Sequence, residues 1–177
     1  MTDRAIIQQV LAGDAEAFAR LVDRHYERCA RIAFRILGNR EDAEEAIQDA
    51  FLRAFRALHT YEDRERFSAW LTRILVNQCR TVLSKVQRRE AVFSEMDLRD
   101  AELFAGDAAL DDAWPDLERA LALLPLEQRE AIVLRYTDDL TYDEMARVTG
   151  VGASALKMRV QRAFARLRAY LEEVRVV

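Results

Sequence analysis

Apolar residues recur at spacings of three and four along most of the chain, a period typical of amphipathic helices rather than strands. With 5 glycines and 2 prolines, few positions interrupt this pattern. Asp14 follows Gly13 in one break and is a good helix N-cap, while Gly38-Asn39 forms another break. The pattern therefore predicts an all-α fold, with amino-terminal helices over Asp3 to Ala12, Ala15 to Leu37, Glu41 to Leu58 and Phe67 to Lys85.

A second set of helices is predicted over Asp116 to Leu124 and from Pro125 to about Tyr136, followed by two short helices within Leu140 to Arg168. Between the two sets, Glu90 to Asp112 mixes acids with small residues and shows no sustained period, which indicates a flexible connector. We therefore predict two small helical domains, residues 1–88 and 114–177, joined by a flexible acidic linker over residues 89–113.

The last two predicted helices have the signature of a helix-turn-helix. Thr141 and Glu144 can form a capping box, and Gly150 tolerates the positive φ at which a helix often ends. At about 100° per residue, one stripe of the second helix must face a core: Leu156, Val160, Ala163, Leu167 and Leu171. The opposite face carries Met158, Gln161, Arg162 and Ala165, and the flanks carry Lys157, Arg159, Arg166 and Arg168.

No acid occurs between Ala153 and Leu171, so a helix in a major groove would present side chains to base edges and cations to phosphates. A solvated basic helix or a partner-binding helix is the alternative for the basic stripe alone. The capped helix and glycine turn upstream favour DNA binding.

Charge is segregated along the chain, although the net charge is only −4 and argues mildly against nucleic acid. Seven basic residues between Arg64 and Arg89 face one acid, Glu65, whereas ten acids between Glu90 and Glu118 face one base, Arg99. A basic block, an acidic linker and a second basic helix suggest two DNA-facing modules rather than one neutral enzyme.

The helix predicted from Phe67 presents Arg73, Asn77 and Arg80 on one face, and the preceding polar loop contains Tyr61. Arginines, an amide and a neighbouring aromatic ring are what a protein needs to hold single-stranded bases. The alternative is ordinary solvated charge, with Tyr61 and Trp70 in the core. The buried side of this helix is expected to comprise Phe67, Leu71, Ile74, Leu75 and Val82.

In the helix before that loop, acids crowd the first turns and favour the helix dipole. Asp49 lies two turns in, where the dipole does not explain it, and should face solvent or a basic partner. The buried side of this helix is expected to comprise Phe51, Leu52, Phe55 and Leu58.

Several classes of function are disfavoured. Cys29 and Cys79 have no CxxC partner, which indicates buried thiols in a reducing cytoplasm rather than a zinc knuckle or disulfide. His25 and His59 are not at metal-ligand spacing, and the chain has no P-loop, GxSxG or dinucleotide turn, so we expect no catalysis, cofactor or metal. No apolar run approaches the roughly 18 residues of a membrane span, and no signal peptide is recognisable, so a soluble cytoplasmic protein is expected.

Four segments together resemble the bacterial sigma factors of the extracytoplasmic-function (ECF) type, small alternative sigma factors with regions 2 and 4 only. The similarity covers almost the whole chain, in the expected order. The segments are DAEEAIQDAFLRAFRAL (Asp42 to Leu58), FSAWLTRILVNQC (Phe67 to Cys79), LPLEQREAIVLRY (Leu124 to Tyr136) and LTYDEMARVTGVGASALKMRVQRAFARLR (Leu140 to Arg168).

This resemblance implies a role for each group of residues. Core RNA polymerase would bind through its clamp helices to Gln48, Asp49 and Phe51. The loop from Thr60 to Arg66 would capture a base flipped from the −10 element, with Asn77 contacting a base and arginines contacting phosphates. The implied −10 residues are Tyr61, Arg64, Arg66, Arg73, Asn77 and Arg80, and the implied −35 residues are Ser154, Lys157, Met158, Arg159, Gln161 and Arg162.

The chain departs from the family pattern at two places in the recognition helix. Many relatives open this helix with Pro-x-Gly-Thr, whereas this chain has Gly152, Ala153, Ser154 and Ala155, which moves the cap to Ser154 or Gly152. Met158 replaces a common serine, so an apolar contact with a thymine methyl can replace a hydrogen bond.

The function expected from the resemblance is promoter-specific initiation with core RNA polymerase, in which promoter DNA is melted by trapping it open. The acidic connector could mimic nucleic acid in the RNA-exit path of the polymerase. The chain ends at Val177, so control by a separate anti-sigma factor is expected. The alternative is a helix-turn-helix regulator that acts on duplex DNA without the polymerase.

Overall fold

The computed structural model describes residues 1–62, 66–93 and 115–175, and every regular element in these ranges is helical, as predicted. The α-helices are α1 (Asp3–Leu11), α2 (Phe18–Leu37), α3 (Arg40–Ala57), α4 (Phe67–Phe93), α5 (Pro115–Ala122), α6 (Leu126–Tyr136), α7 (Tyr142–Thr149) and α8 (Ala153–Arg175). Two short 3-10 helices, η1 (Ala15–Ala17) and η2 (Leu58–Thr60), connect α1 to α2 and extend α3.

The ends of the amino-terminal helices lie at the predicted breaks. The Asp14 carboxylate accepts a hydrogen bond from the Ala17 backbone N–H at 3.1 Å and caps η1. Gly38 ends α2 with φ of 71°, and the Asn39 side chain begins α3 by accepting the Glu41 N–H at 2.8 Å. A left-handed glycine followed by an N-cap turns the chain sharply, so α2 and α3 pack against each other.

Helix α4 is longer than predicted, because it continues beyond Lys85 to Phe93. No glycine or proline occurs in this extension, and its arginines, glutamine and alanine are good helix formers, so nothing local stops the helix. The start of the expected acidic linker is therefore helical. The remainder of the connector prediction, residues 94–112, lies outside the described residues.

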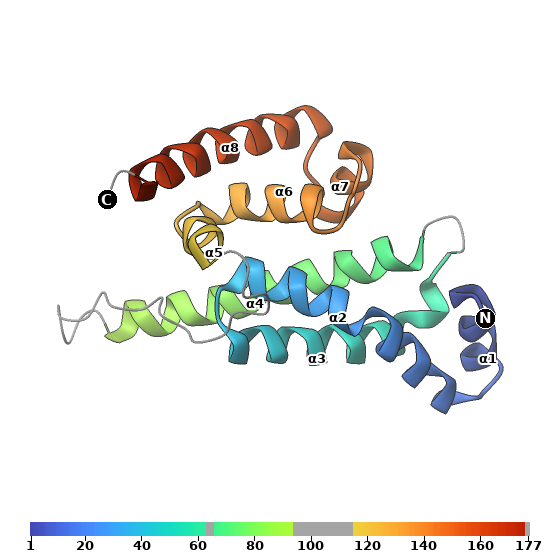
Figure 1. Ribbon diagram of the computed structural model, residues 1–177. Helices are drawn as coiled ribbons and strands as arrows, with labels where there is room; N and C mark the ends of the chain where they lie inside the picture. The colour runs from blue at the N-terminus through green and yellow to red at the C-terminus, as the bar shows by residue number, and fades with distance from the viewer. Residues whose placement is uncertain (63–65, 94–114, 176–177) are drawn as a thin grey trace.

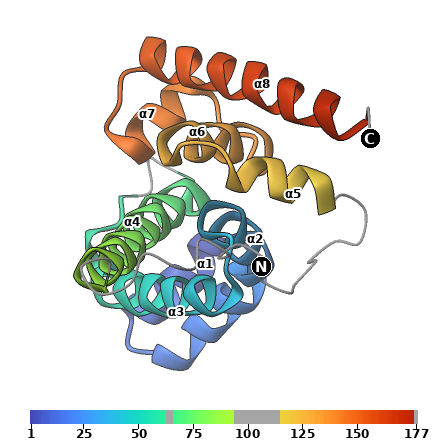
Figure 2. The same ribbon diagram turned by 90° about the vertical axis from the view of Figure 1, so that its left-hand side faces the viewer.

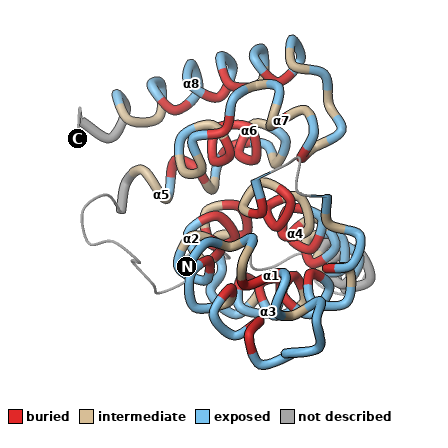
Figure 3. Tube along the Cα trace, turned by 90° about the vertical axis from the view of Figure 1, so that its right-hand side faces the viewer, coloured by how far each residue is buried: buried red, intermediate tan, exposed pale blue. Residues whose placement is uncertain are grey.

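Helices α1 to α4 form one bundle, with α3 packed against both α2 and α4. Figure 3 shows the buried positions facing the interior of this bundle. Phe51 and Leu58 are buried as predicted, but Leu52 is 54% exposed and Phe55 is 41% exposed, so their assignment to the buried side was wrong. The stripe of α3 that α2 and α4 cover consists mainly of small residues: Ala43, Ala46, Ala50 and Ala54.

Helices α5 to α8 form the second bundle, whose core includes Leu134, Leu140, Met145 and Leu156. Helix α6 packs against α8 and α7. The predicted apolar stripe of α8 is confirmed, because Leu156, Val160, Ala163 and Leu167 are buried and Leu171 is partly buried.

The two bundles pack against each other, through contacts of α2 with α5 and α6 and of α4 with α7. Figures 1 and 2 show α6 and α7 between α8 and the amino-terminal bundle. The outer face of α8 therefore points away from α1 to α4.

Candidate nucleic-acid interface

The helix-turn-helix is built by α7 and α8, and its predicted caps are confirmed. Thr141 Oγ1 accepts the Glu144 N–H at 3.3 Å, while Glu144 Oε2 accepts the Thr141 N–H at 2.9 Å. Gly150 ends α7 with φ of 73°. Leu156 N–H donates to the Gly152 carbonyl at 3.1 Å, which places Gly152, rather than Ser154, at the N-cap position of α8.

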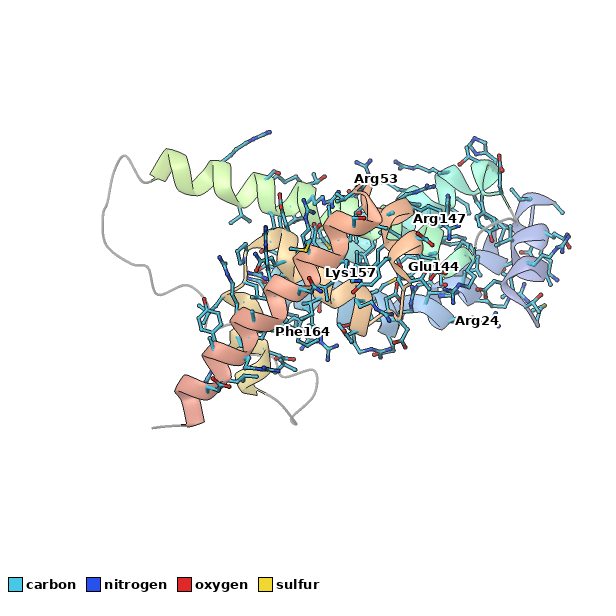
Figure 4. All side chains as sticks on the ribbon, turned by 90° about the horizontal axis from the view of Figure 1, so that it is seen from above. Arg24, Arg53, Glu144, Arg147, Lys157 and Phe164 are labelled. Atoms are coloured by element: carbon cyan, nitrogen blue, oxygen red, sulfur yellow. The ribbon has the colours of Figure 1, made fainter. Side chains whose placement is uncertain are left out.

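The outer face of α8 presents most of the predicted −35 residues to solvent. Met158 is 48% exposed, and Ser154, Lys157, Gln161 and Arg162 are also exposed. Figure 4 labels Lys157 toward the α7 end of α8 and Phe164 further along the same helix. Arg159 is half-buried and pairs with Glu127 of α6 at 2.9 Å. Five of the six predicted side chains thus form one exposed surface.

Tyr61, the aromatic residue of the predicted −10 loop, packs against two aromatic residues at the start of α4. The half-buried Tyr61 ring lies 5.7 Å from the Phe67 ring and 5.4 Å from the Trp70 ring, both edge-on. Trp70 is buried, and Phe67 also contacts it. This cluster agrees with the alternative that placed Trp70 and Tyr61 toward the core. Arg64 lies outside the described residues.

Asn77 is exposed on α4 and lines an open pocket of about 350 Å³ with Arg53 and Arg56 of α3. Ala57, Ile74 and Gln78 complete the lining. Neither arginine was predicted as a site residue, although their spacing of three on one helix is the signal that could have found them. Arg73, one turn before Asn77, is half-buried.

The other two predicted −10 arginines face the carboxy-terminal bundle. Arg80 Nε and Nη2 donate to the two carboxylate oxygens of Glu130 on α6, at 2.8 and 2.7 Å, and the Glu130 side chain is 4% exposed. This hydrogen-bonded pairing raises the pKa of Arg80. Arg66 pairs with Glu144 of the capping box. Figure 4 labels Glu144 on α7.

Further polar contacts join the bundles, and periodicity could not have revealed them. Arg28 of α2 pairs with Asp138, whose Oδ2 also lies 3.1 Å from the Thr72 hydroxyl. Burial raises the pKa of Asp138, and Arg28 opposes that shift. Arg129 of α6 is buried and donates to the Ile36 carbonyl, at the last turn of α2, at 2.9 Å. Burial lowers the pKa of Arg129.

Two of the three residues expected to bind core polymerase, Gln48 and Phe51, line an open apolar groove of about 600 Å³ between α2 and α3. Gln48 is exposed, Asp49 is half-buried, and buried Phe51 forms part of the wall. Leu52 and Phe55, which were predicted to be buried, line the same groove with exposed side chains.

Cys29 and Cys79 are free and buried, and burial raises the pKa of each thiol to about 12, so neither forms a thiolate at neutral pH. Within the described ranges, no group of three or more potential metal ligands occurs. None of the described helices combines the length and apolar character that crossing a membrane requires.

Comparison with known families finds Sigma-70 region 2 over residues 21–89 and Sigma-70 region 4 over residues 115–167. The chain is 34% identical to the ECF RNA polymerase sigma factor SigM of Mycobacterium tuberculosis (strain ATCC 25618 / H37Rv), over 94% of this chain and 83% of SigM. It is 31% identical to the ECF RNA polymerase sigma-E factor of Escherichia coli (strain K12), over 92% of this chain and 91% of that protein.

Two solved structures are similar over most of both chains. The sigma factor RpoE in complex with the anti-sigma factor NepR from Bartonella quintana has a TM-score of 0.73 and 26% identity, covering 88% of this chain and 96% of that chain. CnrH in complex with the cytosolic domain of CnrY has a TM-score of 0.70 and 28% identity, covering 97% of each chain.

The two helical bundles define a DNA-binding protein of the sigma-70 type, because the second bundle contains a helix-turn-helix with an exposed basic recognition helix. Within that class, the chain belongs to the ECF RNA polymerase sigma factors. Members of this family direct promoter-specific transcription with core RNA polymerase, and they are regulatory proteins rather than enzymes.

Proposed function

We propose that this sigma factor reads two promoter elements, the −35 element with α8 and the −10 element with the loop and face at the start of α4. The exposed, acid-free face of α8 around Met158, Gln161 and Arg162 is the observation that carries the proposal. Each bundle binds DNA weakly by itself. Because both bundles are in one chain, binding of one raises the effective concentration of the other at the same promoter.

At the −35 element, Gln161 suits adenine and Arg162 suits guanine, since an amide and a guanidinium match the major-groove edges of these bases. The Met158 side chain suits a thymine methyl. Ser154, Lys157 and Arg159 contact phosphates beside the groove and fix the position of the helix. The −35 preference is therefore expected to include one apolar contact.

At the −10 element, the loop from Thr60 to Arg66 captures a base extruded from the non-template strand. Extrusion costs a few kcal/mol, and binding of the base in the loop offsets that cost only for the right base. The open pocket that Asn77 lines supports the proposed contact of Asn77 with a base, since it combines an amide with two guanidinium groups. Arg66, Arg73 and Arg80 then neutralise phosphates along the strand.

Core polymerase binds at the groove between α2 and α3. This groove combines the exposed apolar side chains of Leu52 and Phe55 with the polar Gln48, and Asp49 is the next residue of α3. An apolar groove of this kind suits a helical partner, and the expected clamp helices of the polymerase are such a partner. Asp49 then gains a basic group opposite its carboxylate.

A separate anti-sigma protein is the expected regulator. The two similar solved structures are both complexes, one with the anti-sigma factor NepR and the other with the cytosolic domain of CnrY. Both match this chain over both bundles. Co-purification with a binding protein that abolishes transcription in vitro is the measurement that tests this partner.

Run-off transcription with core polymerase and a library of random promoters tests the main proposal. We expect initiation only from templates that share two sequence elements at a fixed spacing. Asp49→Ala should lower initiation from every promoter, because it acts on polymerase binding. Absence of initiation, combined with tight binding of the free protein to duplex sites, would instead favour the polymerase-independent regulator.

A further inference from the structure

His25 is a buried titratable residue that the proposed function does not use. It lies on α2, is 7% exposed, and its Nε2 lies 2.8 Å from Oδ2 of Asp3 on α1. Burial lowers the pKa of His25 below its usual value, although the hydrogen bond with Asp3 opposes that shift. The ring is therefore neutral at neutral pH. Because a carboxylate can only accept, Nε2 carries the hydrogen and donates it to Asp3.

The His25 ring also contacts the aromatic cluster at the −10 loop. Its centroid lies 5.2 Å from that of Phe67, the first residue of α4, with the two ring planes at 61°. Phe67 in turn contacts Tyr61 and the buried Trp70. Edge-to-face rings at such distances attract each other and favour a fixed relative orientation. A continuous chain of contacts therefore connects Asp3 of α1, through His25, to the aromatic cluster.

This cluster joins the two ends of the loop to which the proposed function assigns base capture. The loop covers Thr60 to Arg66, so Tyr61 lies near its start and Phe67 follows its end. Helix α1 contacts η2, the 3-10 helix that leads into the loop, and buries Ile6 and Ile7 (Figure 1). The position of both loop ends therefore depends on α1 and α2, although neither helix belongs to the predicted −10 surface.

We propose that His25 is a positioning residue for base capture and that Asp3 holds it in place. The Asp3 carboxylate sets the orientation of the imidazole ring, the ring supports Phe67, and Phe67 supports Tyr61 at the start of the loop. Neither Asp3 nor His25 touches DNA. This inference rests on the proposed function, because the loop that His25 positions is the one that captures the extruded base.

The position of Tyr61 matters because the gain from capture must offset the cost of extrusion. Stacking of a base on an aromatic side chain depends on the orientation of the ring. A displaced ring loses part of this gain, whereas the cost of unpairing and unstacking the base stays the same. Phosphate contacts elsewhere on the protein do not depend on the ring. Loosening of the cluster should therefore reduce base selection more than it reduces general DNA binding.

Three variants of the full chain separate the hydrogen bond from the ring. Asp3→Asn replaces the carboxylate by a weaker, neutral acceptor. His25→Gln keeps a donor for Asp3 but removes the ring, whereas His25→Phe keeps a ring against Phe67 but cannot donate. Asp14→Asn is the matched control, because Asp14 also lies near an arginine of α2, 3.9 Å from Arg20, and has the same charge change. Asparagine is a good N-cap, so η1 keeps its cap.

The packing of the cluster can be measured without DNA. The chain has 2 tryptophans, so Trp114→Phe in every protein leaves Trp70 as the single fluorophore of this kind. Trp70 is 5% exposed, so acrylamide should quench it poorly in the parent protein and in Asp14→Asn. Quenching should increase in Asp3→Asn and increase further in His25→Gln. Unchanged quenching in both variants would overturn the inference, whatever the DNA measurements show.

Holoenzyme made with purified core polymerase then tests base capture. Fluorescence anisotropy at fixed salt compares two forked duplexes with the −10 sequence from the promoter library: one is intact, and the other is abasic at the position where the wild type loses most affinity. The ratio of the two affinities should fall about threefold in Asp3→Asn, as expected for one weakened hydrogen bond. It should fall on the order of tenfold in His25→Gln, as expected for one lost stacking contact. In Asp14→Asn the ratio should be unchanged.

A purely structural role for His25 predicts a different result. Loss of stability would weaken binding to both forks equally and leave the ratio unchanged, which would overturn the positioning role. Asp3→Asn should also have no further effect on the ratio in the His25→Phe background, because Asp3 acts through the imidazole. An equal effect of Asp3→Asn in both backgrounds would contradict this order of contacts.

Failure of the proposed function is distinguishable from failure of this inference. If the loop captures no base, the wild type itself shows no preference for the intact fork, whereas quenching of Trp70 still reports the contacts of His25. Circular dichroism checks that each variant keeps its helices. If His25→Gln loses helicity, Asp3→Asn gives the decisive comparison, because the Asp3 side chain is 26% exposed and its replacement leaves the core unchanged.

Discussion

Arginines on α8 have the same charge but different positions, and so should differ in what they recognise. Arg162 lies on the outer face beside Met158, whereas Arg166 belongs to one flank of the helix. Arg162→Ala should relax the preference at one −35 position, at a cost of about 1–3 kcal/mol for the preferred base. Run-off transcription on the promoter library measures this preference.

Arg166→Ala is the matched control, because it removes the same group from the same helix. It should weaken binding about equally on all promoters, as expected for a phosphate contact. Equal, sequence-independent losses from both variants would contradict base recognition by Arg162.

Glu144 is the residue whose ionisation should most clearly affect stability. The hydrogen bond from the Thr141 N–H, reinforced by Arg66, lowers the pKa of Glu144 to about 2. Its carboxylate therefore stabilises the fold fully above pH 4.5, and this contribution is lost as the pH falls toward about 2. Glu144→Gln should have a smaller fall in unfolding free energy between pH 5.5 and pH 3.

Urea unfolding at these two pH values measures the difference. Other carboxylates also titrate in this range, so the comparison is between the slopes of wild type and variant rather than between absolute values. Identical slopes would show that the Glu144 carboxylate has no special partner in the folded protein.

The turn between α7 and α8 depends on two glycines for different reasons. Gly150 has φ of 73°, a left-handed conformation that costs other residues about 1 kcal/mol, whereas no such φ occurs at Gly152. Gly150→Ala should therefore lower the unfolding free energy by about 1 kcal/mol, although its new Cβ would meet nothing within 4 Å. Thermal unfolding measures this loss.

Gly152→Ser is the control at the N-cap of α8. Serine is favoured at this position over glycine by a few tenths of a kcal/mol, and the site has room for a side chain. Stability should stay unchanged or rise slightly. A similar loss from both substitutions would mean that space, rather than backbone conformation, limits the turn.

Element by element, the sequence predicted what depends on local spacing. The capping box at Thr141, the glycine at position 150 and the buried stripe of α8 were all predicted and are confirmed. The errors on α3 arose because periodicity identifies the apolar face of a helix but does not show how much of that face the neighbouring helices cover. Leu52 and Phe55 are apolar, but α2 leaves them at the open groove.

At the scale of the whole molecule, this groove makes the polymerase interface testable. Leu52 is 54% exposed, so Leu52→Gln should not lower stability but should weaken binding to core polymerase on the order of tenfold. Leu11→Gln is the matched control, because Leu11 is also 54% exposed but lies on α1 outside the groove. Competition binding with purified core polymerase measures both, and equal affinities would exclude the groove as the interface.

The sequence alone determined the helices, most of their caps and the exposed reading face of α8, because each depends on residues within a few turns of one another. Only the tertiary structure decided that α6 and α7 pack against α2 and α4, so that Arg66 and Arg80 meet Glu144 and Glu130. An ion pair between residues distant in sequence produces no periodic pattern along the chain. Its partners are decided by how two finished bundles fit together.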